Sequence, residues 1–352
     1  MRKGLGELKS VKVGLVGLGR LGQQHGDNLA FRIPRCELTA VCSVVEAEVK
    51  QARERWGVPY GYTSYEEMLA NEELDAIFIA SPSGFHCEQI KKGLEKGFHV
   101  FCEKPLGLHL AEVREVENAV NRHKDQVFML GFMRRYDPSY QAAKEKINRG
   151  EIGEPVLIRC YGLDPASQID GFLAFAKAND SGGLFLDMSI HDFDLARWYL
   201  GAEASEVWAI GGSYSRPEFA ELGDAETGAA MVRFDNQAIG LFVAGRNCAH
   251  GYHIETEIIG TKGTIRIGSI PERNQAVVMN EHGVIHECVQ GFIERFEQAY
   301  RAEAEEFIRC ILEGRKPDVT VKDGVESTKL GYACKQSFTT KTLINVQEVI
   351  LA

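Results

Sequence analysis

An acid–base cluster carries the most evident chemistry in this sequence. Asp187 lies four positions before His191, and Asp194 lies three positions after it, so on one continuous helix the three side chains would share a face. Histidine titrates near neutrality, and a carboxylate one helical turn away can orient its ring and set its charge. The spacing predicts a proton-transfer site, although a solvated helix face would show the same pattern.

A glycine-rich loop near the N-terminus forms a second motif, G-x-G-x-x-G, from Gly17, Gly19 and Gly22. It directly follows the strand-like run 11–16 and opens the helical stretch 23–31. In this context the first glycine permits a tight turn, the second lets the backbone approach a pyrophosphate, and the third brings helix against strand. The pattern predicts a dinucleotide site, with a turn needed only for packing as the alternative.

The part of that site where the ribose of the cofactor would lie, here called the ribose corner, departs from the usual pattern. NAD sites normally carry an acidic residue about 20 residues beyond the loop, at the end of the second strand, where this chain has Ser43. Arg20 in the loop could offer a cation to a 2′-phosphate, whereas Ser43 could still bind a ribose hydroxyl, with Glu46 nearby. The sequence therefore allows both NAD and NADP.

A lysine follows another predicted strand. The run 99–102 leads into Glu103, Lys104 and Pro105, and parallel sheets bind ligands at the carboxyl ends of their strands. Lys104 could donate a hydrogen bond to an alcohol oxygen and stabilise its alkoxide character during hydride loss. Pro105 restricts the backbone and permits a cis bond. An ordinary surface lysine is the alternative.

The elements that position these residues differ between the two parts of the chain. As far as about residue 127, apolar runs alternate with amphipathic stretches, which predicts a parallel sheet covered on both faces. We expect an α/β, doubly wound Rossmann domain over 1–133. The strand-like runs are 11–16, 38–42, 76–80, 99–102 and 127–131, and the further helical stretches are 46–56, 65–70, 86–96 and 110–123.

Beyond Gly150 the pattern changes to longer β-rich runs separated by hairpin-type turns. Such alternation predicts an open, mostly antiparallel sheet in a second, α+β domain over 134–352. We expect the helical segment 292–313 to pack on this domain. The clearest runs are 229–234, 239–244 and 254–259, with turns at 235–236, 260–263 and 280–283.

Size and composition fit a soluble two-domain protein. The chain has 352 residues, 44% hydrophobic and 26% charged. Its formal net charge of -10 and the lack of a basic block argue against a nucleic-acid partner. Without a signal-like N-terminus or a run of about 18 apolar residues, we expect a cytoplasmic protein that binds no membrane.

The cysteines and histidines give no expectation of a metal. Nine cysteines are scattered singly, without a C-x-x-C pair, as expected of buried thiols in a reducing compartment. The carboxylates around His191 could ligate a metal, but no second histidine has matching spacing.

Several motifs occur in an order that resembles the Gfo/Idh/MocA oxidoreductases, and the chain looks most like their inositol dehydrogenase branch. The resemblance extends from Val11 to 322–324 and implies a nucleotide-binding domain followed by an open-sheet domain. The outer face of that sheet is expected to form a homo-oligomer, either a dimer or a tetramer. The motifs are 17–22, 80–82 with His86, 103–105, 131–138 and 187–194.

Residue roles follow from this resemblance. It implies that Lys104, Asp187 and His191 are catalytic and that Asp194 contacts substrate hydroxyls. The expected cofactor residues are Gly17, Gly19, Arg20, Leu21, Gly22, Ser43, Ser81, Pro82, His86, Glu103, Lys104 and Arg134. The expected substrate residues are Lys104, Asp164, Asp187, His191, Asp194 and Tyr252, whereas the strand-end pair Arg246 and Asn247 is equally compatible with structural hydrogen bonding.

The implied reaction is reversible oxidation of a secondary alcohol on a polyhydroxylated ring. His191 would take the hydroxyl proton, Lys104 would hold the same oxygen, and Asp187 would orient neighbouring groups. Ser43 and the segment 160–165 depart from the family pattern and leave the nicotinamide and the polyol open. The alternatives are an aldose, an amino sugar or a keto-inositol as substrate, and a nucleotide-binding sensor without turnover.

Overall fold

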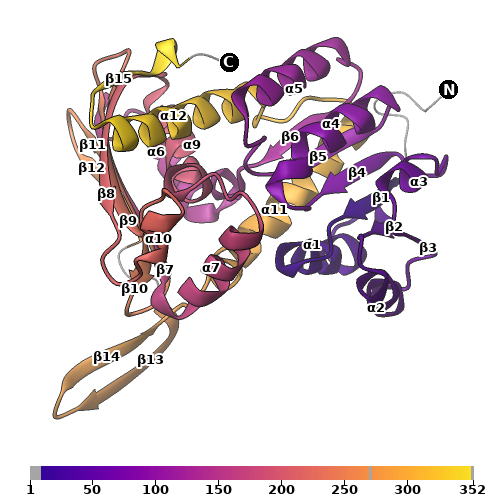
Figure 1. Cartoon of the computed structure of the whole chain (residues 1–352), viewed down its shortest axis with the longest axis horizontal. Helices are drawn as coiled ribbons and strands as arrows, with labels where there is room; N and C mark the ends of the chain where they lie inside the picture. The colour runs from indigo at the N-terminus through magenta and orange to yellow at the C-terminus, as the bar shows by residue number, and fades with distance from the viewer. Residues whose placement is uncertain (1–8, 269–271, 350–352) are drawn as a thin grey trace. The chain divides into compact units, whose positions relative to one another are not determined.

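The computed structural model describes residues 9–268 and 272–349, which fold into two compact units (Figure 1). The first unit contains 9–136 and 298–325, and the second contains 326–349 and the described residues between 137 and 297. The chain enters the first unit again within helix α11 (Phe292–Glu313) and leaves it within helix α12 (Val321–Thr340). The predicted division into 1–133 and 134–352 therefore fails for 298–325, because the chain returns to the first unit.

Six parallel strands form the sheet of the first unit, in the order β3-β2-β1-β4-β5-β6. This arrangement confirms the predicted doubly wound sheet and places its switch point between β1 and β4. Strand β3 was not expected, because its sequence Tyr-Gly-Tyr contains no aliphatic run. The strands are β1 (Val11–Val16), β2 (Cys36–Cys42), β3 (Tyr60–Tyr62), β4 (Ala76–Ile79), β5 (His99–Glu103) and β6 (Phe128–Gly131).

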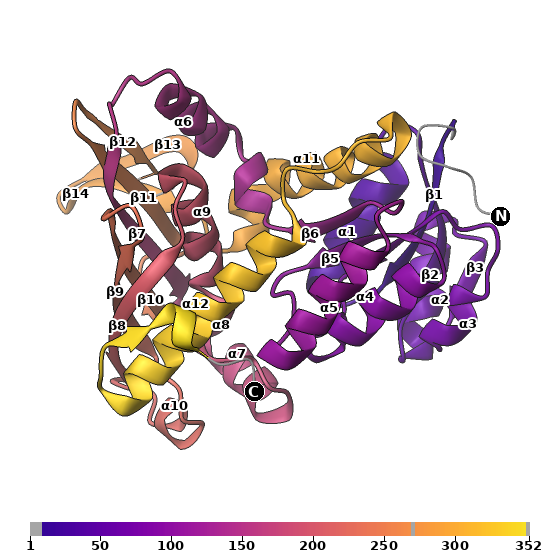
Figure 2. The same cartoon turned by 90° about the horizontal axis from the view of Figure 1, so that it is seen from above.

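Helices cover both faces of this sheet (Figure 2). Val13 and Leu15 pack in the same core cluster as residues of α1 and α2, whereas Gly14, which lies between them, faces Met68 of α3. This alternation follows from the two-residue period of a strand. The helices are α1 (Arg20–Phe31), α2 (Glu46–Trp56), α3 (Tyr65–Leu69), α4 (His86–Glu95) and α5 (Leu110–Arg122).

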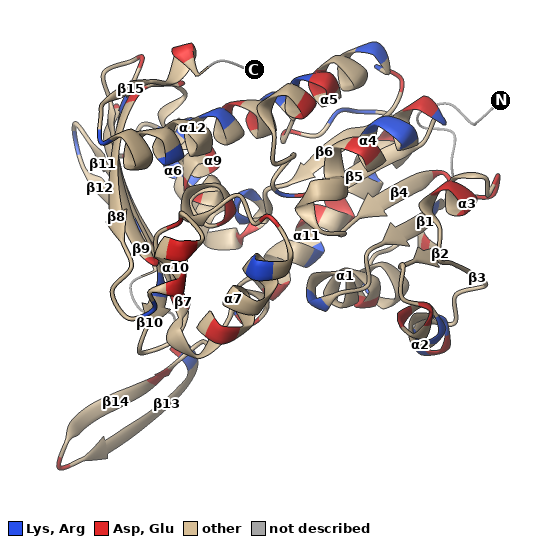
Figure 3. Ribbon diagram, in the orientation of Figure 1, with Lys and Arg blue, Asp and Glu red and all other residues tan. Residues whose placement is uncertain are grey.

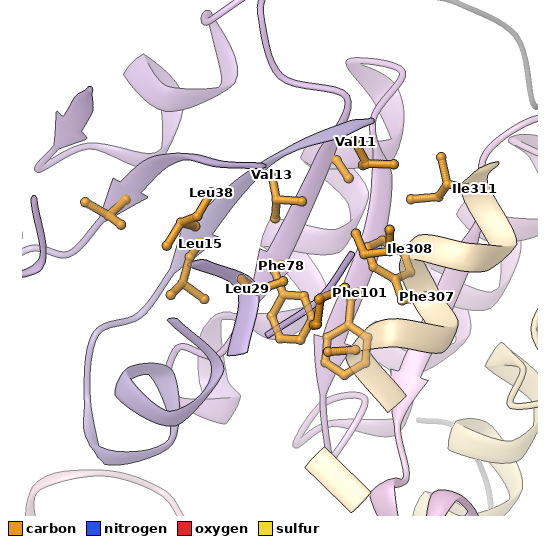
Figure 4. Close-up of a cluster of buried hydrophobic side chains, with 14 of the residues drawn as sticks. Val11, Val13, Leu15, Leu29, Leu38, Phe78, Phe101, Phe307, Ile308 and Ile311 are labelled. Carbon is orange, nitrogen blue, oxygen red and sulfur yellow. The ribbon is translucent and has the colours of Figure 1, made fainter. Parts of the chain in front are cut away.

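The C-terminal part of α11 belongs to the core of the first unit (Figure 4). Phe307, Ile308 and Ile311 are fully or almost fully buried and pack in one cluster with Val11 and Phe101. Burying each side chain contributes roughly 1.5–3 kcal/mol relative to exposure. The expectation that 292–313 packs on the second domain is therefore wrong for this part, because its apolar stripe covers the parallel sheet.

Seven strands form the sheet of the second unit, in the order β12-β11-β7-β10-β9-β8-β15. Only the β7–β10 pair is parallel among these described strands, so the predicted open, mostly antiparallel sheet is confirmed. The three predicted turns join β9 to β10, β11 to β12 and β13 to β14. The sheet strands are β7 (Pro155–Pro165), β8 (Ala204–Gly212), β9 (Thr227–Phe234), β10 (Ile239–Cys248), β11 (His253–Gly260), β12 (Thr264–Ile267) and β15 (Ile344–Asn345).

Helix α9 (Ile190–Leu200) covers one face of this sheet (Figure 2). Its residues are buried except Trp198, and Phe193 makes an edge contact with Phe242 of β10, with 5.0 Å between the ring centroids. Besides parts of α11 and α12, the unit also contains the helices α6 (Pro138–Asn148), α7 (Ile169–Ala178), α8 (Leu184–Asp187) and α10 (Glu218–Glu221).

The opposite face of the sheet exposes large apolar side chains. Trp208 and Met231 pair across β8 and β9 and are 41% and 52% exposed. A separate hairpin, β13 (Glu272–Asn280) with β14 (Gly283–Cys288), exposes Val278, Met279, Val284 and Ile285, and it is largely without charge in its middle (Figure 3).

Two further predictions from the sequence concern the state of the cysteines and membrane-spanning helices. All nine cysteines are free thiols and eight are buried, as the sequence predicts. Among the described helices, none is long and apolar enough to span a bilayer.

Candidate active site

The glycine loop after β1 has the geometry of a phosphate cradle. Gly17 has a φ of +88°, and a Cβ there would lie 2.5 Å from the Ala80 carbonyl, so only glycine fits. A Cβ on Gly22 would lie 2.0 Å from the Gly17 oxygen, so the bare glycine lets α1 pack on the loop. No atom lies within 4 Å of the Cβ position of Gly19. This space allows a pyrophosphate to approach the backbone.

The N-terminus of α1 offers the matching electrostatics. Gly19 is the N-cap and supplies no side-chain acceptor, and the first turn contains no acidic residue. The first N–H groups of a helix lack intrahelical partners, and the positive end of the helix dipole favours an anion. Arg20 is exposed and Leu21 half-buried in this turn. The loop therefore fits the pyrophosphate of a dinucleotide.

The ribose corner contains a carboxylate that sequence spacing did not single out. Ser43 follows β2, is buried, and donates from Oγ to Oε2 of Glu48 at 2.5 Å. The same Oγ accepts from the N–H of Val45 at 3.2 Å. Because Glu48 lies in the first turn of α2, it brings a negative charge to the strand end where Ser43 replaces the usual acid.

His86 connects two loops at the same edge of the sheet. Its Nδ1 lies 2.7 Å from the Pro105 carbonyl oxygen and its Nε2 lies 2.9 Å from the Ser81 carbonyl oxygen. The ring is 1% exposed, and burial lowers its pKa. Ser81 also donates to Gln89, and Pro82 precedes a 3₁₀ turn. The ring of His86 thus lies between the backbone of Pro105 and that of Ser81, and its predicted contact with the cofactor stays a prediction.

Lys104 is half-buried directly after β5, and its peptide bond to Pro105 is cis. Its N–H donates to Oε2 of Glu103 at 3.2 Å, and Oε1 of Glu103 lies 2.7 Å from Nε2 of His25. Glu103 is 4% exposed. Its carboxylate thus accepts from the backbone of Lys104, and its predicted contact with the cofactor stays a prediction.

A third titratable group lies beside this pair. A carboxylate oxygen of Glu303 on α11, a ring nitrogen of His25 and a carboxylate oxygen of Glu103 all lie within 4.8 Å of one another. Glu303 is fully buried, and neither of its oxygens has a hydrogen-bond partner. Burial and the nearby charge of Glu103 raise its pKa well above the usual range. The fold therefore favours the protonated form of Glu303.

Arg134 and Arg135 lie in a 3₁₀ helix, Met133–Tyr136, which follows β6. Both are buried, and Arg135 donates to Asp323 at 2.8 Å. Arg134 thus lies at the carboxyl edge of the sheet, together with the glycine loop and Lys104, whereas Arg135 forms an ion pair with α12.

The acid–base cluster of the second unit is divided between two helices. Asp187 is the last residue of α8 and His191 is the second residue of α9, with Met188 and Ser189 forming a turn between them. The expectation of one continuous helix face is therefore wrong. Ser189 precedes the new helix with helical backbone angles and makes no side-chain capping hydrogen bond. His191 and Asp194 keep their three-residue helical spacing.

Arg246 binds two carboxylates of this unit. Its guanidinium donates to Asp187 at 2.8 Å and reaches Asp164 at 3.5 Å, and its Cζ lies 3.4 Å from the centre of the Phe172 ring. Arg246 is 2% exposed, whereas the side chains of Asp187 and Asp164 are 31% and 29% exposed. A buried cation thus holds two carboxylates that remain accessible. Such a pair can accept hydrogen bonds from neighbouring hydroxyls.

A β-bulge explains how Arg246 reaches this place. Strands β7 and β10 pair in register as far as Leu163 and Gly245, and the register shifts before Cys248 pairs with Pro165. Bulges re-aim side chains at strand ends. Here the bulge brings Arg246 beside Asp164.

Two other predicted substrate residues are buried. Asp194 is 1% exposed on α9, and Tyr252 is 5% exposed. The Tyr252 ring makes an edge contact with Phe296, and its N–H donates to Val289.

Asn247 contributes to a separate, structural network. Its Nδ2 donates to Glu226 at 2.7 Å, and Glu226 also accepts from Ser215 Oγ and from the backbone N–H groups of Tyr214, Ser215 and Arg216. Burial alone would raise the pKa of Glu226, but these hydrogen bonds outweigh it and lower the pKa to about 2. Asn247 therefore supports the fold beside Arg246.

The predicted site residues thus form two sets. The strand ends of the first unit carry the glycine loop, Ser43 and Lys104, and the second unit carries Asp164, Asp187 and His191. Sequence reasoning missed the roles of Glu48 and Arg246. An acidic first turn in α2 could have indicated Glu48, but no local signal identifies Arg246 as the partner of Asp187, 59 positions away.

Comparisons with known proteins extend these observations. Residues 11–132 match a family described as an oxidoreductase family with an NAD-binding Rossmann fold, and residues 140–266 match the GFO/IDH/MocA C-terminal domain. The chain is 33% identical to the myo-inositol 2-dehydrogenase of Thermotoga maritima, with 97% of this chain and 100% of that protein covered. It is 34% identical to the scyllo-inositol 2-dehydrogenase (NAD(+)) of Bacillus subtilis, with 93% and 94% covered.

A solved structure is similar over the whole described fold. It is that of scyllo-inositol dehydrogenase from Lactobacillus casei, with bound NAD(H) and scyllo-inositol. The TM-score is 0.94 and the sequence identity is 44%, with 97% of this chain and 100% of that chain covered.

Proposed function

This chain belongs to the Gfo/Idh/MocA oxidoreductase family, and from this premise we propose that it oxidises a secondary alcohol of an inositol ring to a ketone with NAD. The observation that carries the proposal is the carboxylate pair Asp164 and Asp187, held by the buried Arg246 and accessible on its outer side. A ring that presents several hydroxyl groups needs such fixed acceptors. The similarity to enzymes named inositol dehydrogenases supports the same class of substrate.

In the proposed mechanism, the chain handles the proton and the alcohol oxygen. His191 takes the hydroxyl proton as general base, and Lys104 donates a hydrogen bond to the same oxygen as negative charge grows on it. Asp187 orients a neighbouring hydroxyl. When bound, the nicotinamide supplies the hydride acceptor. His86 and Glu103 keep the loop of Lys104 in place through the contacts described above.

We further propose that the enzyme prefers NAD to NADP. Glu48, hydrogen-bonded to Ser43, brings a carboxylate to the corner where a 2′-phosphate would lie. Like charges placed together cost several kcal/mol, and 1.4 kcal/mol corresponds to about tenfold in affinity. NADH should therefore bind at least about tenfold more tightly than NADPH, and Glu48→Gln should narrow this difference. Equal binding of both to the native enzyme, measured by fluorescence titration, would rule out this preference.

The reaction is tested by screening inositol isomers and common aldoses with NAD and NADP while following the absorbance of the reduced nicotinamide. We expect oxidation of an inositol. Turnover of aldoses alone would mean that the substrate is an aldose and not an inositol, and no turnover with any compound would favour a nucleotide sensor. His191→Ala should lower kcat by roughly 10²–10⁴-fold and leave NAD affinity largely intact. Nearly full activity in that variant would overturn the role of His191.

The exposed apolar face of the second sheet supports assembly into a homo-oligomer, which we propose as a dimer or a tetramer. Trp208 and Met231 lie on this face, and contiguous apolar surface of this kind commonly marks an interface. Sedimentation of the native protein and of Trp208→Glu tests it. A native monomer would contradict the proposal.

A further inference from the structure

Three side chains with metal-binding atoms meet where strand β10 turns into strand β11. Cys248 ends β10, His253 begins β11, and His250 lies in the turn between them. The Cys248 sulfur lies 3.4 Å from Nε2 of His250, and that same Nε2 lies 3.3 Å from Nδ1 of His253. All three donor atoms lie within 4.8 Å of one another. The site belongs entirely to the second unit.

These separations agree with the edges of a tetrahedron around zinc. Zinc binds thiolate sulfur at about 2.3 Å and imidazole nitrogen at roughly 2.0–2.1 Å, in tetrahedral geometry. Such bonds require about 3.6 Å between sulfur and nitrogen and about 3.4 Å between two nitrogens. The observed 3.4 Å and 3.3 Å therefore need only small adjustments along two of the three edges, and the third pair, Cys248 and His253, lies within 4.8 Å.

A carboxylate lies behind His253, as in many histidine metal sites. While Nδ1 of His253 points toward His250, its Nε2 lies 3.5 Å from Oε2 of Glu255. A carboxylate on the second nitrogen fixes the tautomer and the orientation of a ligating ring. Glu255 is itself held by Arg159 and Arg266, so this support is rigid.

The burial of the three residues provides both a protected ligand and an entry path. Cys248 is buried, His253 is half-buried and His250 is exposed. An ion can thus arrive from solvent along His250 and reach a thiol that is shielded from other reactions. Three protein ligands leave one position for water.

We propose that Cys248, His250 and His253 form a binding site for a divalent ion of the zinc type. Binding forms one metal–sulfur bond and two metal–nitrogen bonds, displaces water from the ion, and releases the Cys248 thiol proton to solvent. The ion ties the end of β10 to the start of β11. This binding is independent of the proposed dehydrogenase function, because it requires neither nicotinamide nor polyol.

Cobalt, which reports on its ligands in the visible and near-ultraviolet spectrum, is the probe for this site. The untagged full chain, stripped with a chelator, is titrated with Co²⁺ and then with Zn²⁺. We expect one equivalent of Co²⁺ to bind with a thiolate charge-transfer band and a tetrahedral d–d spectrum, and Zn²⁺ to displace it. Saturation with Zn²⁺ should also raise the melting temperature.

Two variants and two controls separate this site from adventitious binding. Cys248→Ser should lose the charge-transfer band. His250→Ala replaces an exposed residue and will not disturb folding. It should weaken metal binding by more than the roughly 10–100-fold that is typical when a residue hydrogen-bonded to a metal ligand is lost. Cys36→Ser and His286→Asn should bind like the native chain. An unchanged charge-transfer band in Cys248→Ser, unchanged affinity in His250→Ala, or no Co²⁺ binding by the native chain would overturn the proposal.

Discussion

Replacing Arg246 by methionine removes the charge that holds Asp164 and Asp187 while keeping most of the side-chain volume. The native guanidinium is 2% exposed and lies against the Phe172 ring, so methionine can occupy much of the same space. The two carboxylates lose their common counter-ion. The variant therefore tests electrostatic positioning rather than packing.

The expected loss of stability follows from burial and distance. Opposite charges about 4 Å apart attract by about 4 kcal/mol at an effective dielectric constant of 20, and breaking a buried ion pair costs roughly 3–5 kcal/mol. Because Asp187 and Asp164 retain about a third of their side-chain exposure, we expect the low end, about 3 kcal/mol. For a unit of this size, that lowers the melting temperature by about 6–12 °C.

The assay compares Arg246→Met, Arg246→Met/Asp187→Asn and Arg233→Met by thermal unfolding and steady-state kinetics. The double variant should regain part of the lost stability, because one uncompensated carboxylate has been neutralised. Arg233, which is largely exposed in the same sheet, serves as the matched control and should change stability by less than about 0.5 kcal/mol.

The kinetic result separates positioning from general unfolding. Arg246→Met should raise the KM for the polyol and lower kcat while leaving NADH binding, measured by fluorescence, unchanged. A native melting temperature together with a native KM would refute the reasoning, and so would a double variant less stable than Arg246→Met.

Three further predictions test other parts of the structure. Gly19→Ala should keep the native melting temperature but weaken NADH binding, whereas Gly22→Ala should destabilise the fold, because its Cβ would lie 2.0 Å from the Gly17 oxygen. Thermal melts and NADH titrations distinguish the two variants, and equal destabilisation of both would contradict this prediction. The pKa of Glu226 falls from 4.5 to about 2 in the fold, so its contribution to the free energy of unfolding is present above pH 4.5 and disappears as the pH falls toward 2. At about 1.4 kcal/mol per pKa unit, Glu226→Gln should lower this free energy by about 3 kcal/mol at pH 7 and leave it unchanged near pH 2. Urea unfolding at several pH values measures the difference. The pKa of Glu303 is raised in the fold, so its titration lowers the stability of the native chain progressively as the pH rises above 4.5. Glu303→Gln should therefore melt at a higher temperature than the native chain at pH 7–8 and at the same temperature near pH 4. A lower melting temperature of the variant at pH 7 would contradict this prediction.

The parallel sheet was predictable because its strands are apolar on both faces. Val11–Val16 forms β1 as predicted, and the other four predicted runs differ from the observed strands by one or two residues at their ends. Turn glycines and asparagines similarly identified the hairpins of the second sheet. Strand β3 escaped prediction because Tyr60–Tyr62 depends on pairing with β2 rather than on its own composition.

The helical spacing of Asp187 and His191 led to a wrong local structure. A four-residue spacing places two side chains together only on a continuous helix, and here the helix ends at Asp187 and restarts at Ile190. Sequence spacing shows which residues belong together but not which conformation joins them. Asp187 also accepts a hydrogen bond from Arg246, which a bulge in a distant strand brings into place.

Helix α11 shows why amphipathic patterns identify buried faces without identifying their partners. Its apolar stripe predicts burial, and burial is observed, but against the parallel sheet. Glu303 lies in the same helix and is fully buried beside Glu103, whose second oxygen holds the N–H of Lys104. Burial and the neighbouring carboxylate of Glu103 both favour the protonated form of this carboxyl group. The return of the chain therefore places a second buried carboxyl group behind Glu103 and the Lys104 backbone, and no sequence pattern reveals this tertiary contact.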